Sequence, residues 1–129
     1  MAACNNNLLS VVKILIEKGV DYRIFDANNR NCLFYAIING ATDVALFLLN
    51  MNGMDSVDSM NFYNCQDLYG NTPLMYACMF DMVKIANFLL NHPLVDASTK
   101  NVQNSTALII ASHSLNRNMV DIVSKLIEK

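Results

Sequence analysis

The residues of this sequence that could do chemistry are few and scattered. The two histidines, His92 and His113, have no cysteine or carboxylate at a metal-ligand spacing, so we expect solvated loop or turn residues. Asp55 and Asp58 fall in D-S-V-D, but an EF-hand calcium loop needs more oxygen ligands, with Gly and Glu at fixed offsets. Neither a nucleophile motif such as G-x-S-x-G nor a glycine-rich phosphate loop occurs. The pattern therefore predicts no catalytic residue, no metal site, no cofactor and no enzyme activity.

The four cysteines, Cys4, Cys32, Cys65 and Cys78, form no C-x-x-C pair. A disulfide framework is possible by count. Free thiols in a reducing compartment are favoured, because Cys4 and Cys78 lie among apolar and small residues. We therefore expect a cytoplasmic protein, with the nucleus as a second possible compartment.

Composition narrows the classes of partner. The chain has 129 residues, of which 53% are hydrophobic and 16% charged, so a single domain with a sizeable core is expected. The net charge is -2, the basic residues form no stripe, and no apolar run approaches the ~20 residues needed to span a bilayer. We expect a monomer that binds no nucleic acid, no membrane and no small-molecule substrate.

The elements that would position any site are internal repeats. The stretch D-L-Y-G-N-T-P-L-M-Y-A at 67–77 has weaker copies at 26–36 and 101–111. Each copy is followed by a second apolar run, at 44–49, 85–90 and 122–127, and a further run occupies 11–16. The alanines of the frame, Ala3, Ala36, Ala77 and Ala111, are 33, 41 and 34 residues apart, a period typical of stacked helix pairs.

The frame itself predicts a tight turn followed by a short helix. Gly70 would take a positive φ, and the equivalent Asn29 and Asn104 tolerate the same conformation. Thr72 would cap a helix from Pro73 to about residue 79, as would Asn31 and Thr106 in the other copies. The second runs predict longer helices with broad buried faces, ended by Gly19 and Gly53 in the first two copies.

At this point the chain resembles the ankyrin repeat family over its whole length. The family unit reads D-x-x-G-x-T-P-L-H-x-A-A and V-V-x-L-L-L-x-x-G-A-D, and residues of 67–77 and 11–21 match its two halves. The resemblance implies an all-α solenoid of stacked antiparallel helix pairs joined by hairpin-like turns. Residues 1–129 would form one domain of approximate units 1–25 (partial), 26–66 (with a long insertion), 67–100 and 101–129.

Three departures from the family pattern carry expectations of their own. The family histidine is replaced by Phe34, Met75 and Ile109, which predicts units that depend more on packing. Lys125 falls where Ile14, Phe47 and Phe88 would face a neighbouring unit, which favours an outer edge at the C-terminal end. The connection 51–66 is long, and about three extra residues separate the last two helices at 115–118.

Two functions remain open. The first is a binding module that presents turn tips and first helices to a partner protein. The second is a substrate-recruiting or regulatory fragment of a larger enzyme, channel or effector whose catalytic part lies outside these residues. The full-length reading frame would separate the two.

In the ankyrin resemblance, the variable exposed positions are the second, third and fifth residues of each D-x-x-G-x frame and the end of the first helix. Residues of unit 67–100 at these positions are mostly large and apolar, which favours a binding patch with Tyr69 and Phe80 as anchors. The alternative is that Leu68 or Phe80 packs on an adjacent turn or on the long connection. The expected partner-binding residues are Ala27, Asn28, Arg30, Ile38, Asn39, Leu68, Tyr69, Asn71, Met79, Phe80, Val102, Gln103, Ser105, His113 and Ser114.

Overall fold

The computed structural model describes residues 9–19, 25–50, 62–92, 95–113 and 119–128. This part of the chain is helical and contains no strand. Residues 62–64 also form a helical turn. The helices are α2 (Leu9–Glu17), α3 (Cys32–Ile38), α4 (Thr42–Asn50), α6 (Pro73–Met79), α7 (Val83–Asn91), α8 (Ala107–Ser112) and α9 (Met119–Glu128).

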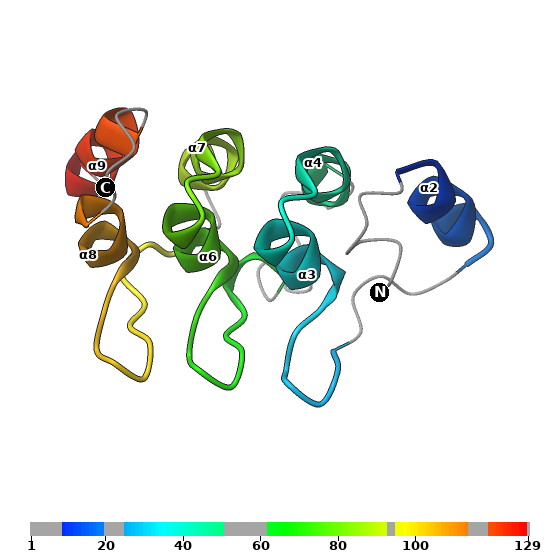
Figure 1. Ribbon diagram of the computed structural model, residues 1–129, viewed down its shortest axis with the longest axis horizontal. Coiled ribbons are helices and arrows are strands. Elements are labelled where there is room, and N and C mark those ends of the chain that lie inside the picture. The colour runs from blue at the N-terminus through cyan, green and yellow to red at the C-terminus, as the bar shows by residue number, and fades with distance from the viewer. Residues whose placement is uncertain (1–8, 20–24, 51–61, 93–94, 114–118, 129) are drawn as a thin grey trace.

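The helices stand in two parallel rows along the long axis of the molecule (Figure 1). The first helices α3, α6 and α8 pack on one another in that order, and the second helices α2, α4, α7 and α9 do the same. Each first helix also packs on the second helix that follows it. The expected all-α solenoid of helix pairs is therefore confirmed.

Each first helix begins at a side-chain cap, as the sequence predicts. The side-chain oxygens of Asn31, Thr72 and Thr106 accept a hydrogen bond from the backbone N–H three residues on. These bonds satisfy amide groups that have no partner inside the helix. Pro73 occupies the first turn of α6, where its missing N–H leaves no bond unmade.

Three turns project to the same side of the solenoid, one ahead of each first helix (Figure 1). We call them the first finger (26–30), the second finger (67–71) and the third finger (101–105). Asn29, Gly70 and Asn104 have φ of 59°, 74° and 62°, which confirms the predicted left-handed position. Gly70 is also needed for space, because a Cβ there would lie 2.9 Å from the Cα of Asn101.

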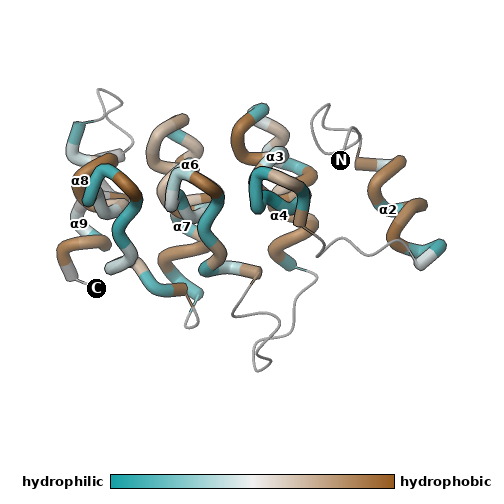
Figure 2. The backbone as a smooth tube through the Cα atoms, turned by 90° about the horizontal axis from the view of Figure 1, so that it is seen from below, coloured by the Kyte–Doolittle hydropathy of each residue, from teal (hydrophilic) through white to brown (hydrophobic). Residues whose placement is uncertain are grey.

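The core runs along the solenoid between the two rows of helices. Long hydrophobic segments lie on the helices, and each helix also carries hydrophilic residues (Figure 2). The buried residues Ile85, Ala86, Leu89 and Leu90 give α7 the broad apolar face that its sequence predicts. The core also includes two aromatic residues, Phe62 and Tyr63, from the end of the long connection.

The structure corrects the expected setting of one histidine. His92 is 8% exposed, and its ring centroid lies 4.2 Å from that of Tyr63, so it is a packed residue and not a solvated one. Tyr63 is itself fixed by donating its hydroxyl to the Leu49 carbonyl at 2.8 Å. His113 is exposed at the end of α8, as predicted.

The expected role of Lys125 as a mark of an outer edge is wrong. Its Nζ donates to Oδ1 of Asn87 on α7, so this helix position faces the preceding helix pair. Phe47, at the equivalent position of α4, also faces the preceding helix, because its ring lies 5.4 Å from Lys13 Nζ on α2. A lysine stem is compatible with this position because its aliphatic part packs while the ammonium reaches a polar partner.

Some of the expectations lie outside the described residues. They concern Cys4, Gly53, Asp55, Asp58 and Ser114, residues 51–61 of the long connection, and the extra residues at 115–118.

Candidate functional site

The fingers owe their common shape to the first residue of each frame. In the second finger, Oδ1 of Asp67 accepts the backbone N–H groups of Tyr69 and Asn71, both at 3.0 Å. Asp26 does the same in the first finger and Asn101 in the third. A short polar side chain that bonds the backbone two residues on is the standard stabiliser of such turns. The D-x-x-G-x frame is thus a turn with its own internal bonds.

Neighbouring fingers are joined edge to edge by their backbones. The N–H of Leu68 donates to the Asn28 carbonyl at 3.2 Å, and the N–H of Val102 donates to the Tyr69 carbonyl at 3.0 Å. Gln66 adds a second connection, because its Nε2 donates to the Lys100 carbonyl at 3.1 Å. The three fingers therefore form one continuous surface.

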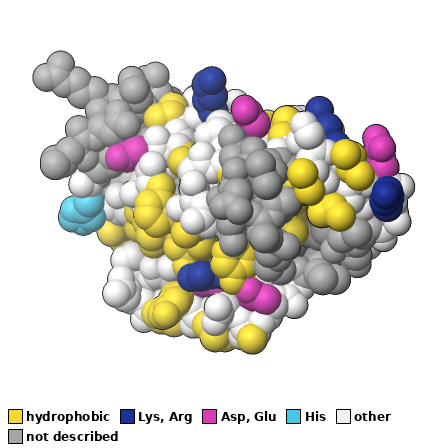
Figure 3. All heavy atoms as spheres, turned by 45° about the vertical axis from the view of Figure 1, so that its right-hand side comes forward, with side chains coloured by type: hydrophobic (Ala, Val, Ile, Leu, Met, Phe, Trp, Pro, Cys, Tyr) yellow, Lys and Arg dark blue, Asp and Glu magenta, His cyan; other side chains and the backbone are white. Residues whose placement is uncertain are grey.

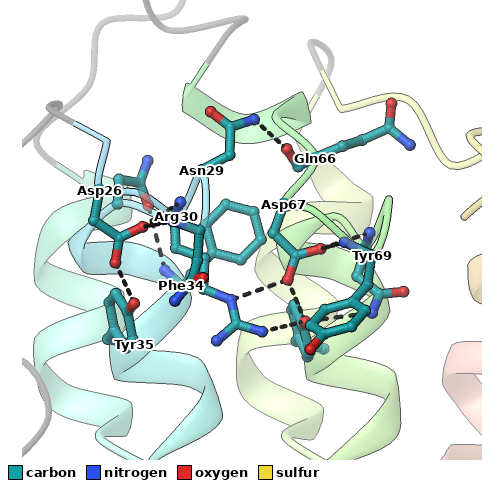
Figure 4. A network of polar contacts seen from close by, with 12 residues as sticks. Asp26, Asn29, Arg30, Phe34, Tyr35, Gln66, Asp67 and Tyr69 are labelled. Atoms are coloured by element: carbon teal, nitrogen blue, oxygen red, sulfur yellow. Dashed lines mark hydrogen bonds and ion pairs between the residues drawn. The ribbon is translucent and has the colours of Figure 1, made fainter.

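A charged network connects the first finger to the second (Figure 4). Arg30 Nε lies 3.0 Å from Oδ2 of Asp67, and its Nη2 donates to the hydroxyl of Tyr76 at 3.0 Å. Tyr76 in turn donates its hydroxyl to Asp67. Although burial opposes the charge, the hydrogen bonds to Asp67 and Tyr76 raise the Arg30 pKa above its ordinary value. Arg30 is thus a fixed cation inside the array.

Tyrosines on the first helices bond the acidic residues that open the first two fingers. Tyr35 donates its hydroxyl to Asp26, as Tyr76 does to Asp67. The Tyr35 bond, with those from backbone N–H groups, lowers the pKa of Asp26 below its usual value. In the first two fingers a tyrosine one place further along the helix than the family histidine therefore anchors the turn of its own unit, and the greater dependence on packing stays a prediction.

An apolar surface lies over this network. Leu68 is 63% exposed, Tyr69 61%, Met79 38% and Phe80 49%, and we call these four residues the aromatic patch. Hydrophobic side chains gather around acidic and basic groups on the face shown in Figure 3. The alternative in which Leu68 or Phe80 is covered by a turn or by the long connection does not apply, because both side chains are exposed.

The two aromatic rings of the patch rest on the charged network. The Phe80 ring stacks on that of Tyr76, with centroids 6.1 Å apart and planes 4° apart. The guanidinium carbon of Arg30 lies 5.8 Å from the Tyr69 ring and 5.6 Å from the Tyr76 ring. Cations at this distance from a ring face attract it electrostatically. Tyr69 and Phe80 are therefore exposed on one side and supported on the other.

The structure places most of the expected binding residues at the surface, with one correction. Asn71 is only 7% exposed, because it donates to the Tyr76 hydroxyl at 3.3 Å and accepts from Asn101 at 2.9 Å. Ile38, Arg30 and Ser105 are half-buried. The exposed members are Ala27, Asn28, Asn39, Leu68, Tyr69, Met79, Phe80, Val102, Gln103 and His113.

A depression of about 580 Å³ opens beside the aromatic patch, between the end of α6 and the third finger with α8. Sequence reasoning missed four of its residues, Cys78, Asp81, Ile109 and Ile110. Ile109 is 41% exposed although it stands where the family has its histidine, and that substitution was the available signal. The residues described in its walls are Cys78, Met79, Asp81, Gln103, Ser105, Ile109, Ile110 and His113.

Two further kinds of chemical group are the candidate metal ligands and the cysteines among the described residues. No three His, Cys, Asp or Glu side chains there gather as metal ligands would. The described cysteines Cys32, Cys65 and Cys78 form no disulfide. Burial raises the pKa of Cys65 and of Cys78 to about 12, which leaves both thiols protonated and poorly nucleophilic at neutral pH. Within the same described ranges, no helix has the length and hydrophobicity to cross a bilayer.

Finger turns followed by paired helices, stacked in register, define the class of repeat proteins built from helix pairs. The family model for ankyrin repeats (3 copies) matches residues 1–61 and 56–129, so the chain belongs to the ankyrin repeat family.

Several curated proteins are similar to this chain. It is 32% identical over 131 residues to ankyrin repeat protein nuc-2 of Neurospora crassa, a match that covers all of this chain and 11% of that protein. Two proteins of Acanthamoeba polyphaga mimivirus also match: putative ankyrin repeat protein R837 at 31% identity over 59% of this chain, and L371 at 24% over 72%. The chain spans about a tenth of the length of each of these relatives.

Proposed function

We propose that this chain is a protein-interaction module that binds a partner protein through the fingers and the exposed ends of the first helices. Ankyrin repeats are in general protein–protein interaction modules and are typically non-catalytic. The observation that carries the proposal is the aromatic patch: four large apolar side chains stand exposed on one finger and the helix end beside it. Exposed apolar clusters of this kind mark interaction sites.

The patch has the physical properties of a binding hot spot. Tyr69 and Phe80 contact Arg30 and Tyr76 in the free chain, and such contacts reduce the side-chain entropy that is lost on binding. Polar groups of Asn28 and Gln103 lie on the adjoining fingers and can form the rim around an apolar centre. Each of the two rings is expected to contribute about 2 kcal/mol or more to binding.

A second function rests on the length of the relatives. Because the chain spans only about a tenth of each, the same surface could recruit a substrate or hold a regulatory contact for a larger enzyme, channel or effector. The partner surface is the same in both cases. The full-length reading frame distinguishes them by showing whether a catalytic or membrane segment is joined to the repeats.

Photocrosslinking tests the proposed surface without knowledge of the partner. A photoreactive phenylalanine analogue replaces Leu68 in the patch or, in a matched control, Ile127 on α9, which is 69% exposed. After irradiation in extract from the source organism, we expect a discrete adduct from position 68 that is lost when Tyr69→Ala and Phe80→Ala are added. Equal adducts from both positions, or adducts that survive the double substitution in a folded protein, would contradict the proposal.

A further inference from the structure

One arginine lies among aromatic rings of two repeat units. The guanidinium carbon of Arg30 is 5.6 Å from the centroid of the Tyr76 ring and 5.8 Å from that of the Tyr69 ring. The ring of Tyr35, on the same unit as the arginine, lies 5.9 Å away. Figure 4 shows the arginine side chain reaching from the first finger towards the second. Because this side chain is only 18% exposed, it lies beneath the aromatic patch more than on its surface.

The backbone fixes where the side chains of Tyr69 and Phe80 begin, but not where their rings point. The N–H of Tyr69 donates to Oδ1 of Asp67 at 3.0 Å, and the Tyr69 carbonyl accepts from the N–H of Val102 at 3.0 Å. The N–H of Phe80 donates to the Tyr76 carbonyl at 3.0 Å. A side chain on a fixed backbone can still take several rotamers. The orientation of each ring therefore depends on the groups that the ring contacts.

A contact of each ring leads back to Arg30. The guanidinium lies directly against the ring of Tyr69. It also donates from Nη2 to the hydroxyl of Tyr76 at 3.0 Å, and the Tyr76 ring is stacked on that of Phe80. Its Nε donates to Oδ2 of Asp67 at 3.0 Å. A planar guanidinium can make such bonds in its plane and receive an aromatic ring on its face, which a lysine ammonium cannot do.

We propose that Arg30 is a positioning residue of the binding site, which orients Tyr69 directly and Phe80 through Tyr76 without touching the partner. The inference rests on the proposed function, in which the aromatic patch binds a partner protein. It gives Arg30 a different role from that of the contact residue expected from the sequence. A partner that touches the second finger and the end of α6 alone therefore depends on the first finger as well.

A random peptide library displayed on phage provides the probe. The library is depleted on Tyr69→Ala/Phe80→Ala and then selected on the whole wild-type chain, so that the recovered peptides need the two rings. One selected peptide is titrated by calorimetry against the wild type and each variant, after circular dichroism has shown that the variant is folded.

The variants remove the guanidinium and are chosen to spare the fold. Arg30→Gln alone would leave the buried carboxylate of Asp67 without its counter-ion, so it is combined with Asp67→Asn. Asparagine can hold a finger at this position, because Oδ1 of Asn101 accepts the N–H groups of Gln103 and Ser105 at 2.9 and 3.0 Å. Should the pair not fold, Arg30→Lys takes its place, because it keeps a positive charge beside Asp67 and loses the planar group.

Lys13 provides a matched control. Its Nζ lies 5.4 Å from the centroid of the Phe47 ring, so it is also a cation beside an aromatic ring. It stands on α2, in the row of second helices, away from the patch. Lys13→Gln should therefore change the affinity for the peptide less than about twofold.

The expected result is a coupling between Arg30 and the two rings. In the wild-type background, Arg30→Gln/Asp67→Asn should weaken peptide binding about fivefold, and Arg30→Lys about threefold. In a Tyr69→Leu/Phe80→Leu background, which keeps apolar side chains without rings, the same changes should cost less than about twofold. The reason is that no ring remains to be oriented there, whereas a purely structural role would give the same loss in both backgrounds.

The other outcomes separate this inference from the proposed function. An equal loss in both backgrounds would mean that Arg30 touches the peptide or acts through the fold alone. No loss in either background would mean that the rings do not depend on it. Both results, like a loss in Lys13→Gln as large as that in the Arg30 variants, overturn the inference and leave the proposed function standing. A library that yields no peptide dependent on Tyr69 and Phe80 overturns the proposed function, and the positioning role falls with it.

Discussion

The first junction joins the first and second fingers, and the second junction joins the second and third fingers. The two junctions have the same backbone hydrogen bond and differ in their side-chain contacts. At the first junction, Arg30 reaches across to Asp67 and Tyr76, and the contact is charged. At the second junction, Asn101 donates to Asn71 at 2.9 Å, and the contact is between neutral amides. Both junctions contain the same backbone N–H to carbonyl bond from one finger to the next.

The difference distinguishes the contacts that stack the helix pairs from the contacts that occur at one junction alone. The internal finger bonds and the backbone bonds between fingers occur at both junctions, so they account for the stacking geometry. The charged network occurs at the first junction, directly beneath Tyr69 and Phe80. We infer that the network holds these exposed rings in place in addition to stabilising the fold.

Removing the acceptor at the charged junction should have the largest effect. Asp67 is 5% exposed, and Asp67→Ala leaves the half-buried Arg30 without its counter-ion, so we expect a loss of about 3–5 kcal/mol in unfolding free energy. Asn101→Ala, at the neutral junction, should cost about 1–3 kcal/mol for its lost hydrogen bonds. Urea unfolding followed by circular dichroism measures both. Equal losses in the two variants would remove the distinction between the junctions.

A substitution in the apolar core provides a reference loss of unfolding free energy with which both junctions can be compared. Leu89 on α7 is fully buried, and Leu89→Ala should cost about 2–5 kcal/mol through lost burial and the cavity left behind. The control, Ile127→Ala, changes an exposed side chain and should stay within about 0.5 kcal/mol. Thermal unfolding compares them, and unchanged stability in Leu89→Ala would mean that the helix register is wrong.

The two junctions should also respond differently to a change at the left-handed position. Gly70→Ala places a Cβ 2.9 Å from the backbone of Asn101 in a conformation with φ of 74°, so we expect a loss of about 1–3 kcal/mol. Asn29→Gly at the first junction removes one hydrogen bond to the Gln66 carbonyl and should cost about 1 kcal/mol or less. A Gly70→Ala protein as stable as the wild type would show that the second and third fingers can separate without cost.

High pH should weaken the charged junction through the ionisation of Tyr76. Burial raises the pKa of Tyr76 above its usual value near 10, and the hydrogen bond to Asp67 raises it further. The unfolded chain releases this proton near pH 10 while the folded chain retains it, so folding stability is lost as the pH rises above 10. Cys65 and Cys78 add a similar loss above pH 9. In Tyr76→Phe the decline above about pH 10 should be shallower, and an identical decline in urea titrations would contradict this role of Tyr76.

The repeat period and the frame made the fold predictable from the sequence. The caps at Asn31, Thr72 and Thr106 and the left-handed residues at 29, 70 and 104 depend on neighbours within a few residues, so local patterns suffice to find them. The direction in which a second-helix position faces could not be found in this way. Lys125 contacts the preceding pair, and this depends on how two helix pairs are rotated relative to each other.

The candidate site was predictable only in part. The exposure of Leu68, Tyr69, Met79 and Phe80 follows from their places in the frame. The burial of Asn71 does not, because it depends on a tyrosine within its own unit and an asparagine from the next. The depression lies between residues more than twenty positions apart, so the substitution at Ile109 marks one wall of it and no local pattern brings the two walls together.

The most direct test of the central claim compares the aromatic patch with a second exposed apolar surface. Val11 and Ile14 on α2 are also exposed. Lys125, at the position equivalent to Ile14, contacts the preceding helix pair, so this position is one that stacks helix pairs on each other. The affinity of the photocrosslinked partner, or of a selected peptide, is measured by calorimetry for Tyr69→Ala/Phe80→Ala and for Val11→Ala/Ile14→Ala. We expect a loss of about 30-fold or more in the first variant and less than about twofold in the second. Equal affinities in two folded variants, or the larger loss in the α2 variant, would contradict the account.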